Sequence, residues 1–178
     1  NLMQVIEHVK SKGQTTLGRP QTTPLNDASP SAAVRLEDIL GQSSAKRSLV
    51  IALAGRHHLL MMGPPGVGKT LLAMAAPSLM PPLQDSQIVE VLRIHSLAGM
   101  EREDVSVPPF RSPHHSSTPA ACLGGGTGQI VPGDVSLAHH GILFLDELPE
   151  FRRDVVEGLR EPLQDGAIHV HRLGRSMQ

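Results

Sequence analysis

The residues with the clearest chemical meaning form a glycine-rich segment that ends in a lysine and a threonine. Residues 63–70 read Gly-Pro-Pro-Gly-Val-Gly-Lys-Thr and match the pattern GxxxxGK(S/T) at every fixed position. In such a loop, main-chain N–H groups converge on phosphate oxygens, the lysine neutralises the outer phosphates and the hydroxyl ligates Mg²⁺. The segment therefore predicts ATP and Mg²⁺ as cofactors. The residues predicted to contact the nucleotide are Gly63, Pro64, Pro65, Gly66, Val67, Gly68, Lys69, Thr70 and Leu71.

A second chemical signal is an apolar run that ends in two carboxylates, at residues 142–147. Parallel strands end at the same edge of a sheet, so Asp146 should emerge beside the glycine-rich segment and hold Mg²⁺ together with Thr70. Glu147 would then polarise the attacking water as a general base. The predicted catalytic residues are therefore Glu147, Lys69 and Asp146, and the predicted metal ligands are Thr70 and Asp146. The alternative is an acidic turn that only caps the next helix.

Paired histidines raise the question of a further metal site, because the chain has 10 histidines and several are adjacent. Adjacent histidines point in different directions, and no cysteine or acidic partner stands at ligand spacing, so we expect no zinc site. A hydrolase triad at His114 and Ser117 lacks a supporting acid and turn. The single cysteine, Cys122, is most simply a small buried hydrophobe.

The elements that must position the two motifs alternate between helix and strand, which predicts an α/β fold with a parallel sheet sandwiched by helices. The apolar run at 58–62 indicates a strand buried on both faces, directly before the glycine-rich loop. Residues 99–135 show little periodicity and read as an irregular insertion. The predicted helices are 43–55, 68–77, 85–95 and 155–163, and the other predicted strands are 141–146 and 167–171.

The composition and the two ends of the chain indicate how it is divided into segments. We expect a short helix at 1–11, a flexible linker at 12–33 and one folded domain over 34–178. Because the chain begins at Asn1 without methionine and stops just after a strand-like stretch, we expect an excerpt of a longer protein.

Charge and apolar content exclude some classes of protein. Lys plus Arg number 16 against 17 Asp plus Glu, so no overall field recruits nucleic acid or a membrane surface. No apolar run is long enough to span a bilayer, and the sequence lacks a signal-peptide pattern. With a single cysteine in 178 residues, these features predict a cytoplasmic protein.

Taken with the segments between them, the two motifs resemble the ComM/YifB family of magnesium-chelatase-like AAA+ ATPases. The resemblance covers roughly Leu36 to Val170. The stretches that match are Ile39-Leu40-Gly41-Gln42, Ala45-Lys46-Arg47, residues 109–115 (Pro-Phe-Arg-Ser-Pro-His-His), residues 132–139 (Pro-Gly-Asp-Val-Ser-Leu-Ala-His), residues 141–151 and residues 159–163.

The resemblance implies a P-loop NTPase of the AAA+ type that works as a homo-hexameric ring. It further implies a helicase that migrates branched DNA in natural transformation and recombination, with branched or single-stranded DNA as partner. Residues 124–133 would be a hairpin-like insertion facing the central pore, and residues 110–115 would lie near the DNA path or a subunit contact. The DNA or pore residues so implied are Arg111, His114, His115, Gly124, Gly125 and Gly126.

The chain departs from a whole family member in ways that limit the expected activity. An N-terminal Lon-protease-like domain, the C-terminal part of the core with its sensor asparagine and arginine finger, and the lid are all absent from these 178 residues. Because ring motors use an arginine from the neighbouring subunit, we expect this segment alone to hydrolyse little ATP.

Three rival functions remain open. A chelatase-type subunit would direct the same ATP cycle at a protein partner. An enhancer-binding transcription activator would need a pore loop that residues 124–129 match only loosely. A scaffold that binds ATP without hydrolysing it would have no use for the water-activating carboxylate Glu147.

Overall fold

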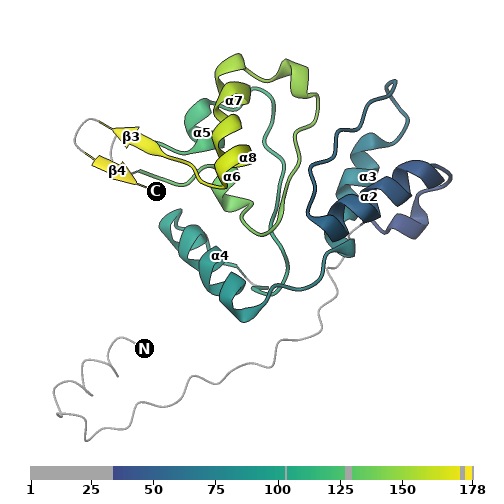
Figure 1. The fold of residues 1–178 in the computed structure, drawn as a ribbon, viewed down its shortest axis with the longest axis horizontal. Helices are drawn as coiled ribbons and strands as arrows, with labels where there is room; N and C mark the ends of the chain where they lie inside the picture. The colour runs from purple at the N-terminus through teal and green to yellow at the C-terminus, as the bar shows by residue number, and fades with distance from the viewer. Residues whose placement is uncertain (1–33, 103, 127–129, 173–174, 178) are drawn as a thin grey trace, which may run out of the picture.

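A computed structural model describes residues 34–102, 104–126, 130–172 and 175–177, so the helix expected at 1–11 and the linker expected at 12–33 lie outside the described residues. Figure 1 shows α2 and α3 grouped on one side, α5 to α8 on the other, and α4 beside them. In chain order the elements are η1 (Leu36–Asp38), α2 (Ser43–Gly55), α3 (Lys69–Ala75), η2 (Ala76–Leu79), α4 (Asp85–Leu97), β1 (Phe110–Arg111), α5 (Pro119–Leu123), α6 (Asp134–Leu137), β2 (Ile142–Leu143), η3 (Leu148–Glu150), α7 (Arg153–Gly158), α8 (Arg160–Asp165), β3 (Val170–Arg172) and β4 (Arg175–Met177).

A first core forms where α2 packs beside α3 and η2. Leu49 of α2 and Leu72 of α3 are buried in it together with Ile39 from the segment before α2. The helix predicted at 43–55 is confirmed, although its N-cap is Gln42 in a left-handed conformation and not a serine side chain. The second predicted helix is also confirmed, since α3 passes into a 3-10 turn where Pro77 stands.

A second core lies under α5 and α7, where Cys122, Phe151 and Val155 are buried against one another. The expectation that the cysteine is a buried hydrophobe is confirmed. The single helix predicted at 155–163 is instead two short helices, α7 and α8, which meet at Leu159. Pro162 explains the break, because its ring and its missing N–H disturb the helical turn before it.

The parallel sheet consists of β1 and β2, with Phe110 opposite Ile142 and Arg111 opposite Leu143. The strand predicted at 141–146 is thus found, although only two of its residues pair as a strand. Gly141 is required at its start, because a Cβ there would lie 1.9 Å from the carbonyl oxygen of Pro109. Ile142 of β2 packs against the first core, and Leu145, just after the strand, packs against the second.

The strand predicted at 58–62 is wrong. These residues belong to no strand among the described residues, and Leu60 and Met62 are 71% and 84% exposed. An apolar run indicates that the residues tend to be buried. A strand also needs a neighbouring strand that forms hydrogen bonds with its backbone N–H and C=O groups. The predicted sheet between two layers of helices is therefore reduced, in the described part of the chain, to β1 with β2.

The prediction of an irregular insertion at 99–135 is also wrong in part. It contains β1 and α5, and thus a strand of the sheet and one wall of the second core. Elements of two to five residues are too short to produce a visible periodicity, which is why the sequence gives no sign of them. Within it, Gly125 and Val131 exchange two backbone hydrogen bonds of 3.0 Å as an antiparallel bridge, while residues 127–129 lie outside the described residues.

The remaining strand prediction, 167–171, overlaps β3, which pairs antiparallel with β4. The helix predicted at 85–95 is confirmed as α4, with Val91 and His95 on its buried face. None of the described helices combines the length and apolar character needed to cross a membrane.

Candidate active site

The glycine-rich loop turns sharply into α3. Gly66 and Gly68 have φ angles of 80° and 87°, in the left-handed region that glycine adopts without steric cost. The Lys69 ammonium donates hydrogen bonds of 2.9 Å to the carbonyl oxygen of Gly63 and 3.0 Å to that of Pro64. The lysine is therefore folded back over its own loop, and its charge lies inside the curve where an anion would be held.

The loop meets the end of the β2 segment through one side-chain contact. The Thr70 hydroxyl donates a hydrogen bond of 2.9 Å to Oδ2 of Asp146, across 76 residues of sequence. A hydroxyl and a carboxylate at this separation offer two oxygen ligands to one hard cation, and oxygen is the ligand that Mg²⁺ prefers. The residues present therefore fit a magnesium ion.

Glu147 follows directly and is held in an uncommon backbone conformation. Its φ is 54°, in the left-handed region, and its N–H donates to Oδ1 of Asp146 at 3.0 Å. Its side chain is 68% exposed. Non-glycine residues in this region cost free energy and cluster at functional sites, so the conformation supports a role for this carboxylate.

The two histidines expected near the DNA path are placed differently from each other. His115 lies with Nδ1 3.8 Å from Oε2 of Glu147, and its ring packs edge-on against Phe151. His114 lies against His115 with ring centroids 4.0 Å apart and planes tilted by 38°, and its Nδ1 is 2.8 Å from the Ser116 hydroxyl. The structure thus brings His115 to the carboxylate predicted to activate water, a proximity that sequence reasoning missed.

Arg111, also expected near DNA, is held within the chain. Its Nε and Nη2 donate to Oδ1 of Asp134 at 2.8 and 2.5 Å, and its side chain is 32% exposed. The ion pair connects β1 to the first residue of α6. The three glycines of the expected pore hairpin lie at its base, Gly125 in the antiparallel bridge with Gly124 before it and Gly126 after it.

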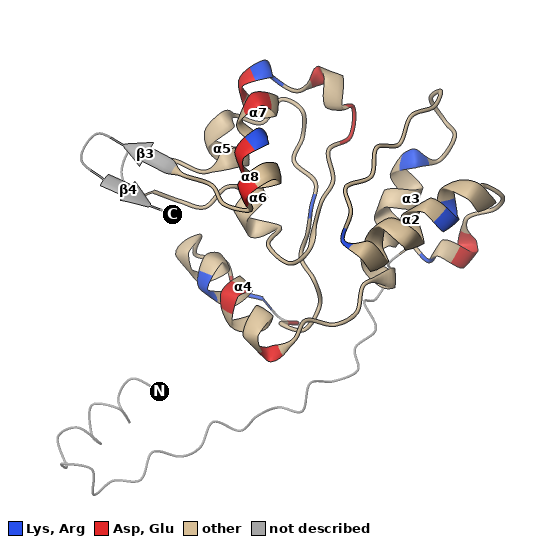
Figure 2. Cartoon of the chain, viewed as in Figure 1, with Lys and Arg blue, Asp and Glu red and all other residues tan. Residues whose placement is uncertain are grey.

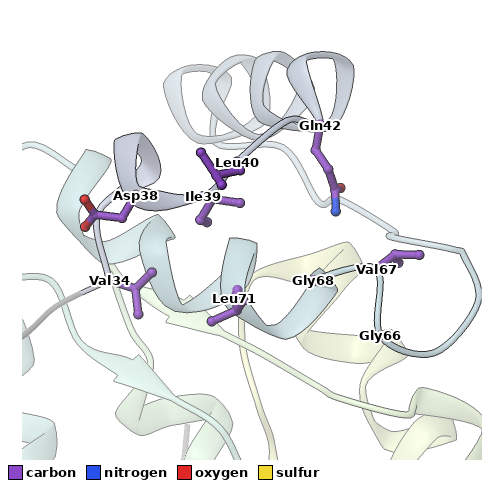
Figure 3. A pocket seen from close by; sticks show the side chains of 9 residues that line it. All are labelled: Val34, Asp38, Ile39, Leu40, Gln42, Gly66, Val67, Gly68 and Leu71. Atoms are coloured by element: carbon purple, nitrogen blue, oxygen red, sulfur yellow. The ribbon is translucent and has the colours of Figure 1, made fainter.

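An open hollow of about 480 Å³ lies between the segment before α2 and the glycine-rich loop (Figure 3). In Figure 3 the Gln42 side chain points toward Gly68, and a Cβ on that glycine would lie 3.3 Å from the Gln42 amide nitrogen. Lys46 donates to the carbonyl oxygen of Ile39 and so anchors this segment to α2. The residues that line the hollow are Val34, Asp38, Ile39, Leu40, Gln42, Gly66, Val67, Gly68 and Leu71.

Sequence reasoning did not assign the part of this hollow contributed by residues 34–42. The signal was present, because the stretch Ile39-Leu40-Gly41-Gln42 stands out as one of the segments that resemble the AAA+ family. No periodicity or charge pattern in those residues points to a ligand. Their place in the hollow follows from their position against the glycine-rich loop.

Comparison with known proteins agrees with this geometry. The family model described as "Magnesium chelatase, subunit ChlI" matches residues 35–178. The chain belongs to this magnesium chelatase family. Membership places the chain among AAA+ proteins, a class that in general uses a nucleotide with Mg²⁺. In this magnesium chelatase domain, the loop at 63–70 and the pair Thr70 and Asp146 are the features that fit that use.

Curated relatives of this magnesium chelatase domain include YifB and ComM proteins, so the resemblance to the ComM/YifB family is confirmed. It is 46% identical over 163 residues to YifB of Salmonella typhimurium, and 48% identical over 164 residues to an uncharacterized protein, Rv2897c, of Mycobacterium tuberculosis. Each alignment covers 90% of this chain and 32% of the relative. It is also 48% identical over 145 residues to the competence protein ComM of Haemophilus influenzae, covering 80% of this chain and 28% of that protein. The chain thus spans about a third of the length of these relatives.

Proposed function

We propose that this chain is the nucleotide-binding core of an ATPase that hydrolyses ATP with Mg²⁺ at the loop of residues 63–70. The supporting observation is the 2.9 Å hydrogen bond between Thr70 and Asp146. It joins the glycine-rich loop to the acidic end of a strand, as expected if the two motifs form one nucleotide site. Neither a chance glycine turn nor an acidic helix cap requires that contact.

The nucleotide would lie along the loop with its base toward the hollow. Main-chain N–H groups of residues 63–70 face the phosphates in this proposal, and Lys69 exchanges its two carbonyl partners for phosphate oxygens because they carry negative charge. The walls of the hollow from Val34, Ile39 and Leu71 are apolar, which suits a purine ring that must leave water.

Catalysis would divide between the two carboxylates. Bound Mg²⁺ supplies charge neutralisation on the phosphate oxygens. Asp146 keeps Thr70 oriented and completes the oxygen ligands, while Glu147 accepts the proton of the attacking water. Glu147 suits the second role because its side chain is exposed and its backbone is held by Asp146.

We extend the proposal to the full-length protein as a cytoplasmic homo-hexamer that remodels branched or single-stranded DNA. Support comes from the ComM/YifB family and from its member in Haemophilus influenzae, the competence protein ComM. The position of His115 beside Glu147 would let DNA that contacts residues 110–115 influence hydrolysis. Because an arginine of the neighbouring subunit completes such sites, we expect little turnover from these 178 residues alone.

A second candidate is a chelatase-type ATPase that remodels a protein partner, which the description of the matching family favours. Both candidates use the same ATP site. They differ in the response to DNA, since DNA should stimulate hydrolysis only in the first.

The enzymatic proposal is tested by ATPase and nucleotide-binding measurements on the full-length protein. Lys69→Ala should abolish ATP binding, because the ammonium that faces the phosphates is removed. Glu147→Gln should keep binding and lower kcat by at least ~100-fold, since it removes only the general base. The matched control is Glu150→Gln, an exposed carboxylate in η3 that should leave kcat unchanged. Full activity of Glu147→Gln would refute the assignment.

The DNA proposal needs a control for the ion pair of Arg111. Arg111→Ala and Asp134→Asn both remove the ion pair, but only the first removes the guanidinium. If this arginine contacts DNA, then Arg111→Ala loses DNA-stimulated hydrolysis and branched-DNA unwinding, while Asp134→Asn retains them. Equal losses in the two variants would instead make Arg111 a structural residue and contradict the proposed contact.

A further inference from the structure

A cluster of two histidines and a glutamate lies away from the nucleotide loop, where α4 passes the turn between α6 and β2. Nε2 of His139 is 3.0 Å and Nε2 of His140 is 2.7 Å from the same oxygen, Oε2 of Glu90. One ligand atom from each of the three residues lies within 4.8 Å of the other two. Two imidazoles and a carboxylate therefore converge on one point from two separate elements.

The convergence contradicts the argument that adjacent histidines point in different directions. His140 has a φ of 57°, in the left-handed region, whereas that argument assumes an extended chain. The turn brings the two rings to the same side, with centroids 4.0 Å apart and planes 50° apart. The acidic partner is likewise supplied by α4, 49 residues before His139, and not by a neighbour in sequence.

The turn that presents the histidines is fixed on both sides. Just before it, the carbonyl oxygen of Leu137 accepts a hydrogen bond of 3.0 Å from Nε2 of buried His95 on α4. Just after it, the N–H of Gly141 donates to Ala138 at 2.8 Å, and Gly141 sits tightly against Pro109. The histidines and Glu90 are thus held toward each other by backbone contacts that need no ligand.

We propose that Glu90, His139 and His140 bind a zinc ion, with water in the fourth position. Imidazole nitrogen and carboxylate oxygen are preferred zinc ligands, at about 2.0 to 2.2 Å, and three protein ligands with one open position are a common set. The ligand atoms already lie close to the mutual spacing that such a shell needs. Exposed fractions of 52%, 40% and 20% for the three side chains leave room for the water.

This site is separate from the proposed nucleotide site and does not depend on it. His140 precedes β2, whereas Asp146 follows it, and the two sets of ligands share no residue. The ligand sets also differ, because Mg²⁺ prefers oxygen ligands and would not displace zinc from two imidazoles. A zinc ion here would connect α4 to the start of β2.

The first experiment measures metal binding directly. The full-length protein is stripped of metal with a chelator and titrated with Zn²⁺ in competition with a chromophoric chelator. We expect tight zinc binding at this site that excess Mg²⁺ does not displace. Co²⁺ in place of Zn²⁺ should give the visible absorption of a four-coordinate ion. A titration without binding would overturn the proposal.

The second experiment assigns the ligands with variants chosen to preserve the fold. Glu90→Gln keeps the size of an exposed side chain, and His140→Asn keeps a residue that tolerates a positive φ. Each should weaken zinc binding by more than about 100-fold, since even loss of an outer-shell partner costs 10- to 100-fold. Each should still bind ATP as the wild type does, which shows that it is folded.

The matched control is the double variant His57→Ala and His58→Ala, an exposed adjacent pair in a different region. It should bind zinc at this site as tightly as the wild type. A second histidine contacts a glutamate, because Nδ1 of His169 lies 2.5 Å from Oε1 of Glu161. The variant His169→Ala is therefore a further control. If zinc binding is lost in either of these controls and kept in Glu90→Gln and His140→Asn, the site is elsewhere and the proposal is wrong.

Discussion

The side chain of His95 connects two helices but leaves one of its ring nitrogens without a hydrogen bond among the described residues. It is 5% exposed, and its Nε2 donates to the carbonyl oxygen of Leu137, which connects α4 to α6. Its Nδ1 is buried and has no hydrogen-bond partner within the described residues. Burial lowers the pKa of His95, with nearby Arg102 and Arg111 acting in the same direction. The folded protein therefore holds this imidazole in its neutral form.

This pKa shift predicts a dependence of stability on pH. The unfolded chain takes up a proton at His95 near its ordinary pKa of 6.5, whereas the folded chain resists it until lower pH. Above about pH 6.5 His95 is neutral in both states and does not lower the free energy of unfolding. As the pH falls below that value, protonation of the unfolded chain lowers this free energy. In His95→Gln, which keeps a donor for Leu137, the free energy of unfolding should fall less steeply below that pH. Denaturant titrations at several pH values measure it, with exposed His58→Gln as control; equal slopes for wild type and His95→Gln would contradict the assignment.

Among the elements, the contact between β1 and β2 decides where the acidic residues emerge. The N–H of Ile142 donates to Pro109 and that of Phe144 donates to Arg111, both at 2.8 Å. These bonds fix the direction in which the chain runs toward Asp146. The close approach of the two strands exists only because residue 141 has no side chain.

We therefore expect Gly141→Ala to destabilise the protein strongly. The new Cβ would meet the carbonyl oxygen of Pro109 at 1.9 Å, backbone against backbone, which should cost about 3 kcal/mol of unfolding free energy. Gly99→Ala is a suitable comparison, because its Cβ meets nothing within 4 Å but its φ is 70°, which should cost about 1 kcal/mol. Chemical unfolding of both variants gives the two values. A smaller loss in Gly141→Ala than in Gly99→Ala would show that the strands can separate without penalty.

In the whole molecule, the two cores meet at the segment around β2, and the Thr70 to Asp146 hydrogen bond joins them across the site. Figure 2 shows that acidic and basic residues are interspersed along α4, α7 and α8. A nucleic acid would therefore have to be recognised at a local patch. The proposed nucleotide site, in contrast, lies between the two cores, where a bound ligand would contact residues from both sides.

A ligand at that position should stabilise the chain as a whole. At a concentration about 100 times its Kd, ATP with Mg²⁺ contributes about 2.7 kcal/mol. This should raise Tm by roughly 5 to 10 °C for a chain of this size. Asp146→Asn should lose most of the part that depends on Mg²⁺, and Lys69→Ala should lose the whole shift. Thermal melts with and without Mg²⁺ measure both, and an undiminished shift in Lys69→Ala would place the nucleotide elsewhere.

Local patterns in the sequence were sufficient for the helices α2, α3 and α4, and for the expectation that Asp146 lies beside Thr70 of the glycine-rich loop. Each of these depends on spacing along the chain or on the rule that parallel strands end at one edge. The sequence alone contains this information, because helical periodicity and the loop pattern involve residues that are close together in the chain.

The pairings between distant residues could be read only from the three-dimensional arrangement. Residues 58–62 are apolar yet unpaired within the described chain, Arg111 faces Asp134, and Glu90 meets two histidines 49 and 50 residues later. The physical reason is the same in each case. The tendency to be buried and the charge are properties of each residue, but the contact partner of a residue depends on the tertiary fold. A left-handed backbone conformation such as that of His140 can place neighbouring side chains on the same side, contrary to what their spacing in the sequence suggests.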